Sequence, residues 1–226
     1  MKPPFAKLFA LAAVALLLAA PGLRAADMGE RIHAATANLD RKQHSGDPIP
    51  ADLLANAKGV AFFHLTKGGL GIGGMGGEGI VVTRRATTFG HVWTAPTAFN
   101  LGGGSIGAQI GFTEADYIVV LNTDDAVQHF TGTGKMQWDA TATGTAGATN
   151  ATERASTTDL AHRELVVYKD TDGVFGGATL GGATVKRKSS INREAYGSVR
   201  FEDILNGTVK APKSADRLYL LLNGKA

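Results

Sequence analysis

Two glycine-rich motifs are the first features of this sequence that suggest a ligand site. The pattern GxGxxG occurs at Gly71, Gly73 and Gly76, and again at Gly102, Gly104 and Gly107. In dinucleotide-binding proteins these glycines follow a strand and open a helix, whose N-terminus holds the pyrophosphate. Here each copy leads into apolar residues with the pattern of a strand, as in Gly79-Ile80-Val81-Val82. We therefore expect no nucleotide site, and the sequence predicts no cofactor.

The abundance of glycine favours a steric explanation for these motifs. The chain contains 30 glycines. A glycine in a strand lets another backbone or a bulky side chain approach closely, or marks a bulge. The glycines between 102 and 111 and between 176 and 182 therefore predict strands that cross tightly or curl into a partial barrel.

The titratable side chains form no recognisable catalytic or metal-binding motif. The 6 histidines have neither HxH nor HExxH spacing, and the chain has no cysteine for a structural zinc site. His64 lies in an apolar run and is expected to pack. Glu78, Glu114 and Asp116 are carboxylates of the kind that perform acid–base chemistry, but no nucleophile–base pair accompanies them. We therefore expect a protein that is not an enzyme, without a bound metal.

Clustered basic residues are the best candidate site. Lys186, Arg187 and Lys188 follow a predicted strand, and Arg193 comes shortly after them. Phosphate pairs well with Arg and Lys donors, so this cluster predicts contact with anionic lipid headgroups. A solvated strand end explains the same residues without any ligand. Weaker candidates for the same role are Arg84, Arg85 and Lys58.

The segment 27–44 is predicted to be a helix. Met28, Ile32, Ala35 and Leu39 recur at helical spacing and define one apolar face. An apolar face beside basic residues is typical of helices that lie in a membrane interface, so Met28, Ile32 and Leu39 are the predicted membrane-facing residues. The face is thin, however, and packing against a sheet explains it equally well.

The remaining elements predict an α+β fold, with an antiparallel, glycine-rich, curled sheet or partial barrel and flanking helices at both ends. A helix start is indicated at Thr123, where Asp124 and Asp125 suit the first turn. Closing helices are expected at 201–205 and about 214–223. The predicted strands are 60–65, 79–83, 91–95, 105–112, 117–121, 165–168 and 174–186.

Residues 1–25 have the pattern of an export signal. Lys2 and Lys7 precede an uncharged apolar run from Leu8 to Ala20, which Pro21 and Gly22 end. A retained anchor is the alternative, although the run is shorter than the ~20 apolar residues that span a bilayer. We expect a periplasmic or secreted protein, peripheral to the membrane. Residues 26–226 would form a single domain, with its core at 50–207.

The charge balance excludes one class of partner. The chain has 23 Lys and Arg against 20 Asp and Glu, and the predicted signal holds three of the basic residues and no acid. Without the signal the protein is neutral, whereas nucleic-acid binders usually carry a strong basic excess. We therefore expect no nucleic-acid partner.

Several segments, in order along the chain, resemble one known family. The match begins at Leu53-Leu54-Ala55-Asn56-Ala57-Lys58-Gly59 and continues through the first glycine motif to Trp93-Thr94-Ala95-Pro96. It includes the second glycine motif and Asp116-Tyr117-Ile118-Val119-Val120-Leu121, and ends at Phe201-Glu202-Asp203-Ile204-Leu205-Asn206-Gly207. These segments are similar to the SYLF domain, also called the Las17-binding or actin-regulator family. The likeness covers roughly residues 34–207.

The resemblance implies lipid binding. Eukaryotic members bind phosphoinositides through a basic surface and an amphipathic N-terminal segment, and some bind actin. Bacterial members are exported and are thought to contact membrane lipid. This sequence departs from the eukaryotic pattern, since it is neutral without the signal and has no SH3 or FYVE domain. Because actin is absent from the periplasm, the expected partner is anionic membrane lipid.

Two classes of function therefore stay open. The first is a peripheral module that binds anionic phospholipid surfaces. The second is a structural or protein-interaction module of the cell envelope, with a protein partner and no lipid ligand.

Overall fold

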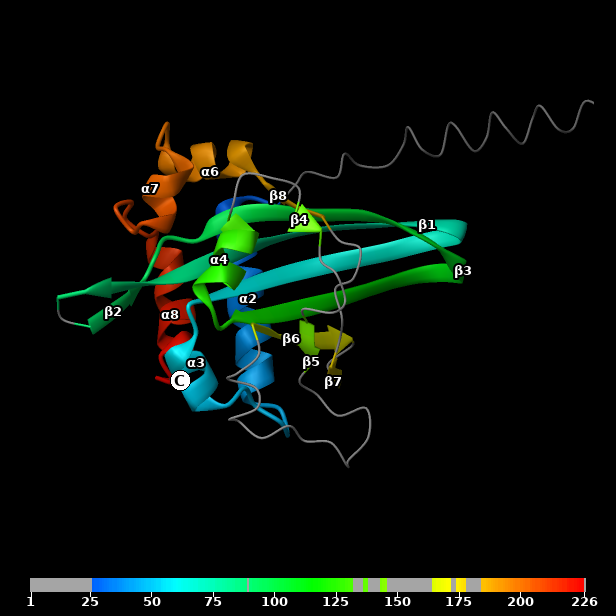
Figure 1. The fold of residues 1–226 in the computed structure, drawn as a ribbon, viewed down its shortest axis with the longest axis horizontal. Helices are drawn as coiled ribbons and strands as arrows, with labels where there is room; N and C mark the ends of the chain where they lie inside the picture. The colour runs from blue at the N-terminus through cyan, green and yellow to red at the C-terminus, as the bar shows by residue number, and fades with distance from the viewer. Residues whose placement is uncertain are drawn as a thin grey trace, which may run out of the picture.

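The computed structural model describes residues 26–88, 90–131, 136–137, 143–145, 164–171, 174–177 and 184–225. Helices from both ends of the chain flank a central sheet (Figure 1). The α+β prediction, with a curled antiparallel sheet and terminal helices, is confirmed. The export signal predicted at 1–25 lies outside the described residues, as do Gly181, Gly182 and most of the segment 135–152. Within the described residues no helix has the length and apolar character needed to cross a membrane.

The strands form one eight-stranded sheet with the order β2-β1-β3-β6-β5, in which β7 also pairs with β6, and β8 pairs with β3 and β4. All of these pairs are antiparallel except β5–β6. The strands are β1 (Gly59–Thr87), β2 (Gly90–Trp93), β3 (Thr97–Leu121), β4 (Met136–Gln137), β5 (Thr143–Thr145), β6 (Leu165–Thr171), β7 (Val174–Gly177) and β8 (Thr184–Arg187).

Helices precede and follow these strands, and one, α4, lies between β3 and β4. In chain order they are α2 (Met28–Gln43), α3 (Ala51–Asn56), α4 (Asp124–Thr131), α6 (Ser189–Tyr196), α7 (Phe201–Leu205), the 3-10 turn η1 (Lys213–Ala215) and α8 (Asp216–Leu222). The sequence did not predict α6, because Ser189-Ser190 and Asn192 have low helix propensity. Its buried Ile191 and Asn192 show that tertiary contacts stabilise it instead.

The first glycine motif lies inside a strand. Residues 60–65 and 79–83, predicted as separate strands, are the two ends of β1, which is 29 residues long. Its glycines face those of β3, with Gly74 opposite Gly104 and Gly76 opposite Gly102. A strand ladder joins backbone groups, so residues without side chains can still pair along it.

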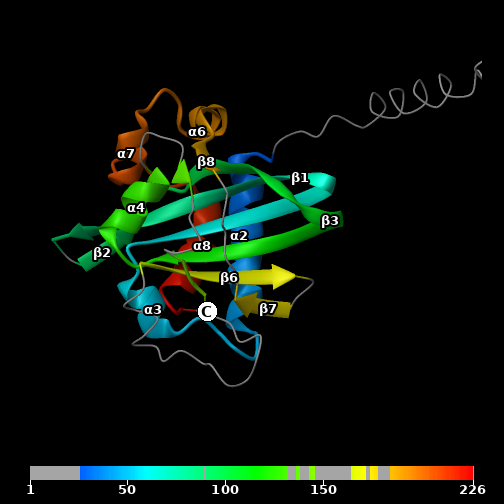
Figure 2. The same cartoon turned by 45° about the vertical axis from the view of Figure 1, so that its right-hand side comes forward.

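The β1–β3 ribbon folds back on itself. Figures 1 and 2 show both strands running away from α7 and α8, reversing, and returning. The register between them shifts between Leu70 and Ile72. The returning half of β1 then lies against the outgoing half, so that a Cβ atom on Gly79 would overlap the carbonyl oxygen of Phe62. The close approach occurs at Gly79, which the sequence did not single out, whereas a Cβ atom on Gly102, one of the glycines for which tight crossing was predicted, would lie 4.0 Å from its nearest neighbour.

Strand alternation divides the core into two clusters, one on each face of the curled sheet. Phe62, Ile80 and Ile118 belong to the cluster that packs beneath α2, α3 and α8. Phe63 and Val81, each one residue further along, belong to the cluster on the other face, which α4 covers with Ala126. Successive side chains of a strand point to opposite faces, which is why adjacent apolar residues serve both clusters.

The N-terminal helix α2 packs on the sheet. Asp27 caps it, accepting a hydrogen bond from the backbone of Glu30, whose side chain returns one to the backbone of Asp27. Met28 is 6% exposed, and Ile32 and Leu39 are fully buried in the core. The prediction that these three residues face a membrane is therefore wrong for this fold, because the sheet and α8 already cover the apolar face.

Candidate functional site

The basic run at the end of β8 is divided between the two faces of the sheet. Lys186 is exposed, whereas Arg187 turns to the opposite side, because adjacent residues of a strand alternate. The guanidinium carbon of Arg187 lies 3.5 Å from the centre of the Phe201 ring. Its Nη1 lies 3.6 Å from a carboxylate oxygen of Glu202, and its Nη2 donates to the carbonyl of Thr131. Arg187 therefore ties α4 and α7 to the sheet.

Partial burial also changes the electrostatics of Arg187. Desolvation lowers the pKa of its guanidinium, and the nearby carboxylate of Glu202 opposes that shift. An arginine starts from so high a pKa that it remains charged. The charge of Arg187 is thus already engaged by Glu202 and the Phe201 ring, and is less accessible to a headgroup than that of Lys186.

Lys188 immediately precedes α6, and Arg193 lies in the last turn of that helix. Lys188 is half-buried and Arg193 is exposed. Asn192 holds this helix against β3, because its side-chain oxygen accepts a hydrogen bond from the Ala98 backbone at 2.7 Å and its amide returns one at 3.3 Å. The backbone amide of Lys188 also donates to Ala98, at 3.0 Å. Lys186, Lys188 and Arg193 lie within eight residues of one another around the junction of β8 and α6, and we name them the β8–α6 basic group.

The weaker candidates lie at another corner of the molecule, where the β1–β2 hairpin meets α3 (Figure 1). Arg84 donates to the carbonyl oxygens of Leu54, at 3.0 Å, and Ala55, and thus satisfies the C-terminal end of α3. Its guanidinium stacks 4.4 Å from the Trp93 ring centre. Arg85 and Lys58 are exposed. Arg84 is therefore engaged by α3, whereas Arg85 Nη1 donates to the carbonyl of Gly207, just after α7, at 3.5 Å.

A buried arginine, Arg31, fixes the first turn of α2 to the fold-back of the ribbon. Its side chain is 2% exposed and its Nη2 lies 2.9 Å from the Glu78 carboxylate. Its Nη1 donates to the carbonyls of Gly79, at 3.2 Å, and Phe99, at 2.9 Å, which face each other across β1 and β3. Burial lowers the pKa of Arg31, and Glu78 opposes the shift. The sequence gave no indication of this role, because all of its partners except Ala26 lie at least 47 residues away.

A polar row crosses three neighbouring strands beneath the other end of α2. His64, Asp116 and Asp170 occupy facing positions on β1, β3 and β6. His64 Nδ1 lies 2.9 Å from one oxygen of Asp116, and Arg41 of α2 lies 2.8 Å from the other. Arg41 also reaches Asp170 at 3.1 Å. The expectation that His64 packs is therefore wrong: its side chain is 46% exposed, although it lies on the same face of β1 as the buried Phe62.

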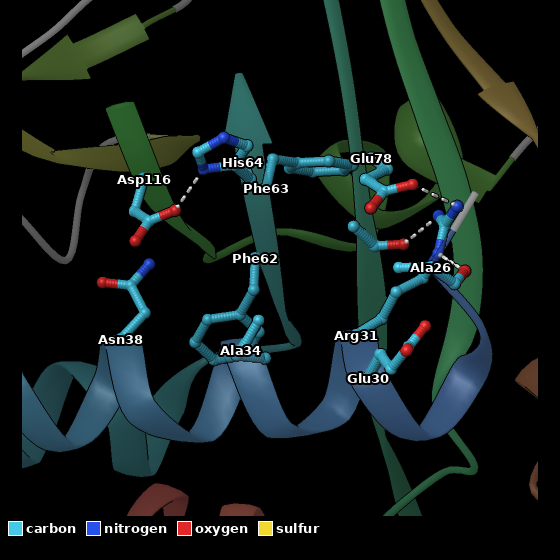
Figure 3. Close-up of a pocket in the computed structure, with 12 residues that line it drawn as sticks. Ala26, Glu30, Arg31, Ala34, Asn38, Phe62, Phe63, His64, Glu78 and Asp116 are labelled. Atoms are coloured by element: carbon cyan, nitrogen blue, oxygen red, sulfur yellow. Dashed lines mark hydrogen bonds and ion pairs between the residues drawn. The ribbon is translucent and has the colours of Figure 1, made fainter. Parts of the chain in front are cut away.

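A small pocket opens between α2 and the fold-back, and both polar arrangements contribute to it (Figure 3). Its volume is about 60 Å³. Glu30, Ala34 and Asn38 line it from α2, and His64 and Asp116 line it from the sheet. The walls also include the two phenylalanines Phe62 and Phe63, and the Glu78 carboxylate that pairs with Arg31.

The side chains that line the pocket include a histidine held by a carboxylate. The His64–Asp116 pair resembles a base held by a carboxylate, but the residues lining the pocket include no serine, threonine, lysine or tyrosine to act as a nucleophile. The described part of the chain also holds no group of three His, Asp or Glu residues able to bind a metal ion. Both GxGxxG motifs lie within β1 and β3, so neither opens a helix as a dinucleotide site requires.

Comparison with known protein sequences shows which family this chain resembles. Residues 102–225 match the model of the Ysc84 family, described as "Las17-binding protein actin regulator". An SH3 domain-containing protein of Schizosaccharomyces pombe is 32% identical over 84% of this chain and 45% of its own length. LAS seventeen-binding protein 3 of Saccharomyces cerevisiae is 29% identical over 79% of this chain and 39% of its own length.

A human relative shows the same partial coverage. SH3 domain-containing YSC84-like protein 1 of Homo sapiens is 31% identical over 77% of this chain and 51% of its own length. The chain thus spans about half, or less, of the curated relatives it matches. Since the family model covers more than half of the chain and agrees with the resemblance seen in the sequence, the chain belongs to the Ysc84 (SYLF) family.

Proposed function

We propose that this chain is an exported, non-enzymatic module that binds peripherally to membranes containing anionic phospholipid. The observation that carries the proposal is the β8–α6 basic group. Lys186, Lys188 and Arg193 lie within eight residues of one another, and they form no ion pair with a carboxylate of the described residues. Unpaired basic side chains at a surface attract anionic headgroups, because phosphate is matched by their N–H donors.

The first described residue, Ala26, lies near the basic group. The carbonyl of Ala26 accepts a hydrogen bond from Arg31, and Arg31 donates to the side chain of Asn100. Asn100 faces Lys186 across the β3–β8 pair. The point where residues 1–25 join the domain is therefore next to the basic group. A domain approaching the membrane from that end would present its basic group to the headgroups.

Sedimentation with lipid vesicles tests this proposal. Residues 26–226 should pellet with phosphatidylglycerol vesicles more than with phosphatidylcholine vesicles, and added salt should weaken the binding. The triple variant Lys186→Glu, Lys188→Glu, Arg193→Glu should bind on the order of a hundredfold more weakly, since each basic residue near an anionic surface contributes about 1 kcal/mol. Arg187 stays unchanged because it holds α4 and α7.

A matched control separates this site from overall charge. Lys210, Lys213 and Lys225 are exposed lysines outside the basic group. Reversing these three to Glu makes the same change in net charge, and should leave most of the binding intact. Equal loss in both triple variants, or equal pelleting with neutral vesicles, would show that the basic group is not the site.

A second candidate, a docking module for a protein partner, is favoured by the free edge of β2. Among the described strands β2 pairs only with β1, and Val92 on it is 47% exposed. An exposed edge strand can pair with a strand of another protein. The family is described as Las17-binding, which makes protein binding a reasonable function for a member. Val92→Lys should then abolish capture of an envelope protein without changing vesicle sedimentation.

A further inference from the structure

Two half-buried lysines, Lys67 of β1 and Lys169 of β6, share one face of the sheet. Each lies two residues beyond an apolar residue of its strand, Leu65 in β1 and Val167 in β6. Both apolar residues belong to the core cluster on the face that α4 covers, so alternation along the strands directs both lysines to that face. Figure 2 shows β6 lying alongside β3, the strand that separates the two lysines.

The strand between them leaves room for the two side chains to approach. Lys67 faces Thr113 across β1 and β3, and Lys169 faces Tyr117 across β3 and β6. Ala115 lies between Thr113 and Tyr117 on the same face of β3. Its methyl group fills little space, so long side chains from the neighbouring strands can extend over it. Burial lowers the pKa of Lys67, and the charge of Lys169 lowers that pKa further, so the two ammonium groups lie within electrostatic reach.

Among the described residues no carboxylate neutralises this pair. Neither lysine has an ion-pair or hydrogen-bond partner in the described ranges. The acids of the same part of the sheet, Glu114, Asp116 and Asp170, occupy the alternate positions of β3 and β6, which point to the face beneath α2. On that face Asp116 and Asp170 bind Arg41. The sheet thus places these acids on one face and the two lysines on the other.

An anion is the ligand that this arrangement matches. Two positive charges without a counter-charge repel each other, and partial burial makes the repulsion stronger than in bulk water. An oxyanion between the ammonium groups would relieve it, because each lysine presents three N–H donors. We propose that Lys67 and Lys169 together bind a doubly charged phosphate group, either free phosphate or a phosphate monoester. The exposed hydroxyl of Thr113, opposite Lys67, is a further donor.

This site is separate from the β8–α6 basic group. Lys186 faces Asn100 of β3, and Asn100 alternates with Phe99, which belongs to the same core cluster as the residues around Lys67. Lys186 therefore lies on the opposite face of the sheet, where Arg31 of α2 contacts Asn100. The phosphate site consequently does not depend on vesicle binding by the β8–α6 basic group.

Titration of the ¹⁵N-labelled protein with sodium phosphate tests the proposal by NMR, at a mildly alkaline pH where phosphate is mostly doubly charged. Backbone amide signals of Lys67, Ala115 and Lys169 should shift and saturate, with a dissociation constant on the order of 1 mM, because so small an ion makes few contacts. Sodium chloride at equal ionic strength supplies no oxyanion and should give no saturating shift at these positions.

Two variants locate the site, and a third serves as the control. Lys67→Met and Lys169→Met keep an unbranched side chain and remove its charge. Each should weaken phosphate binding by about tenfold or more, because a charged donor is lost. Each should leave the unfolding temperature equal or higher, since the repulsion between the ammonium groups is lost as well. Lys186→Met makes the same substitution on the opposite face of the sheet and should bind phosphate like the natural protein.

Every outcome of this titration decides for or against the site. Saturation that persists in both Lys67→Met and Lys169→Met, or equal shifts with chloride, would overturn the proposal. No saturation in the natural protein would also overturn it and would show that the lysines are merely solvated. An equal loss in Lys186→Met would show that binding follows net charge and not this pair.

Vesicles then identify the source of the phosphate group. Phosphatidic acid carries a phosphate monoester, whereas phosphatidylglycerol carries a diester, and vesicles of the two lipids are matched in surface charge. Tighter sedimentation with phosphatidic acid that Lys67→Met removes indicates the lipid, and equal sedimentation indicates a soluble phosphate compound. The triple variant of Lys186, Lys188 and Arg193 should keep its phosphate saturation, so the anionic-lipid proposal stands or fails on a separate measurement.

Discussion

Asp116 holds His64 on one carboxylate oxygen, at 2.9 Å, while its other oxygen binds Arg41 at 2.8 Å. The contact between His64 and Asp116 joins β1 to β3, and that to Arg41 joins both strands to α2. One side chain thus connects the sheet with the helix that covers it. The connection lies outside the apolar core, at the rim of the pocket beneath α2.

Replacing Asp116 with Asn should loosen the C-terminal half of α2. The change removes the charge that binds Arg41 and His64, and we expect a loss of about 1 kcal/mol, as is typical of partly exposed ion pairs in a network. Amide hydrogen exchange should become faster in the last turns of α2. Glu114→Gln is the control, because Glu114 is 55% exposed and 4.0 Å from His64. Equal effects of the two variants would refute the linking role of Asp116.

Replacing Gly79 with Ala should destabilise the fold-back of the ribbon. The added Cβ would overlap the Phe62 carbonyl, so one half of β1 has to shift, at a cost of about 1–3 kcal/mol. Gly76→Ala, in the same strand, places its Cβ in open space and should change stability by less than about 0.5 kcal/mol. Urea unfolding of both variants measures the difference. A Gly79→Ala protein as stable as Gly76→Ala would contradict the tight packing.

Replacing Arg187, but not Lys186, should destabilise the protein. Arg187→Leu loses the stacking on Phe201 and the hydrogen bond to Thr131, together worth about 1–2 kcal/mol. Lys186→Leu removes an exposed side chain, with an expected change within about 0.5 kcal/mol. Thermal unfolding distinguishes the two. If the variants unfold at the same temperature, these contacts of Arg187 do not stabilise the fold.

Lys42 should make stability depend on pH in the alkaline range. Burial lowers the pKa of its ammonium below the ordinary 10.5, although Asp47 opposes the shift. Between the two pKa values the unfolded chain binds the proton more often than the folded one, so the free energy of unfolding rises with pH. Relative to Lys42→Met, the natural protein should therefore gain stability as the pH is raised from neutral toward 10.5. A constant difference in urea unfolding across that range would show that the pKa is not lowered.

The regular elements were largely predictable because their causes are local. The spacing of Met28, Ile32 and Leu39 predicted a helix, and Asp27 with Glu30 caps it as the sequence allows. The glycine segments were recognised as steric, but not as one continuous strand. Glycine carries little local preference for a strand, so only pairing with β3 shows that β1 continues through them.

The candidate sites depend on tertiary contacts, which local sequence patterns do not specify. Lys186, Arg187 and Lys188 were read as one cluster because they are adjacent, yet alternation along β8 turns Arg187 to the other face. The pocket was not predicted, because Asn38, His64 and Asp116 come from three elements. Nothing in the immediate sequence around Asn38 indicates that its side chain is buried without a partner.

By itself the sequence determined the family, the α+β class and the principal helices, because motifs, apolar periodicity and capping residues act over a few positions. The tertiary structure decided which residues are free to act. It buried the apolar face of α2, turned Arg187 inward, and brought Asn38 and Asp116 together over a distance of 78 residues. The physical reason is that burial and pairing depend on which surfaces meet when the β1–β3 ribbon folds back. No local sequence pattern in the glycine-rich segments specifies which residues the fold-back brings together.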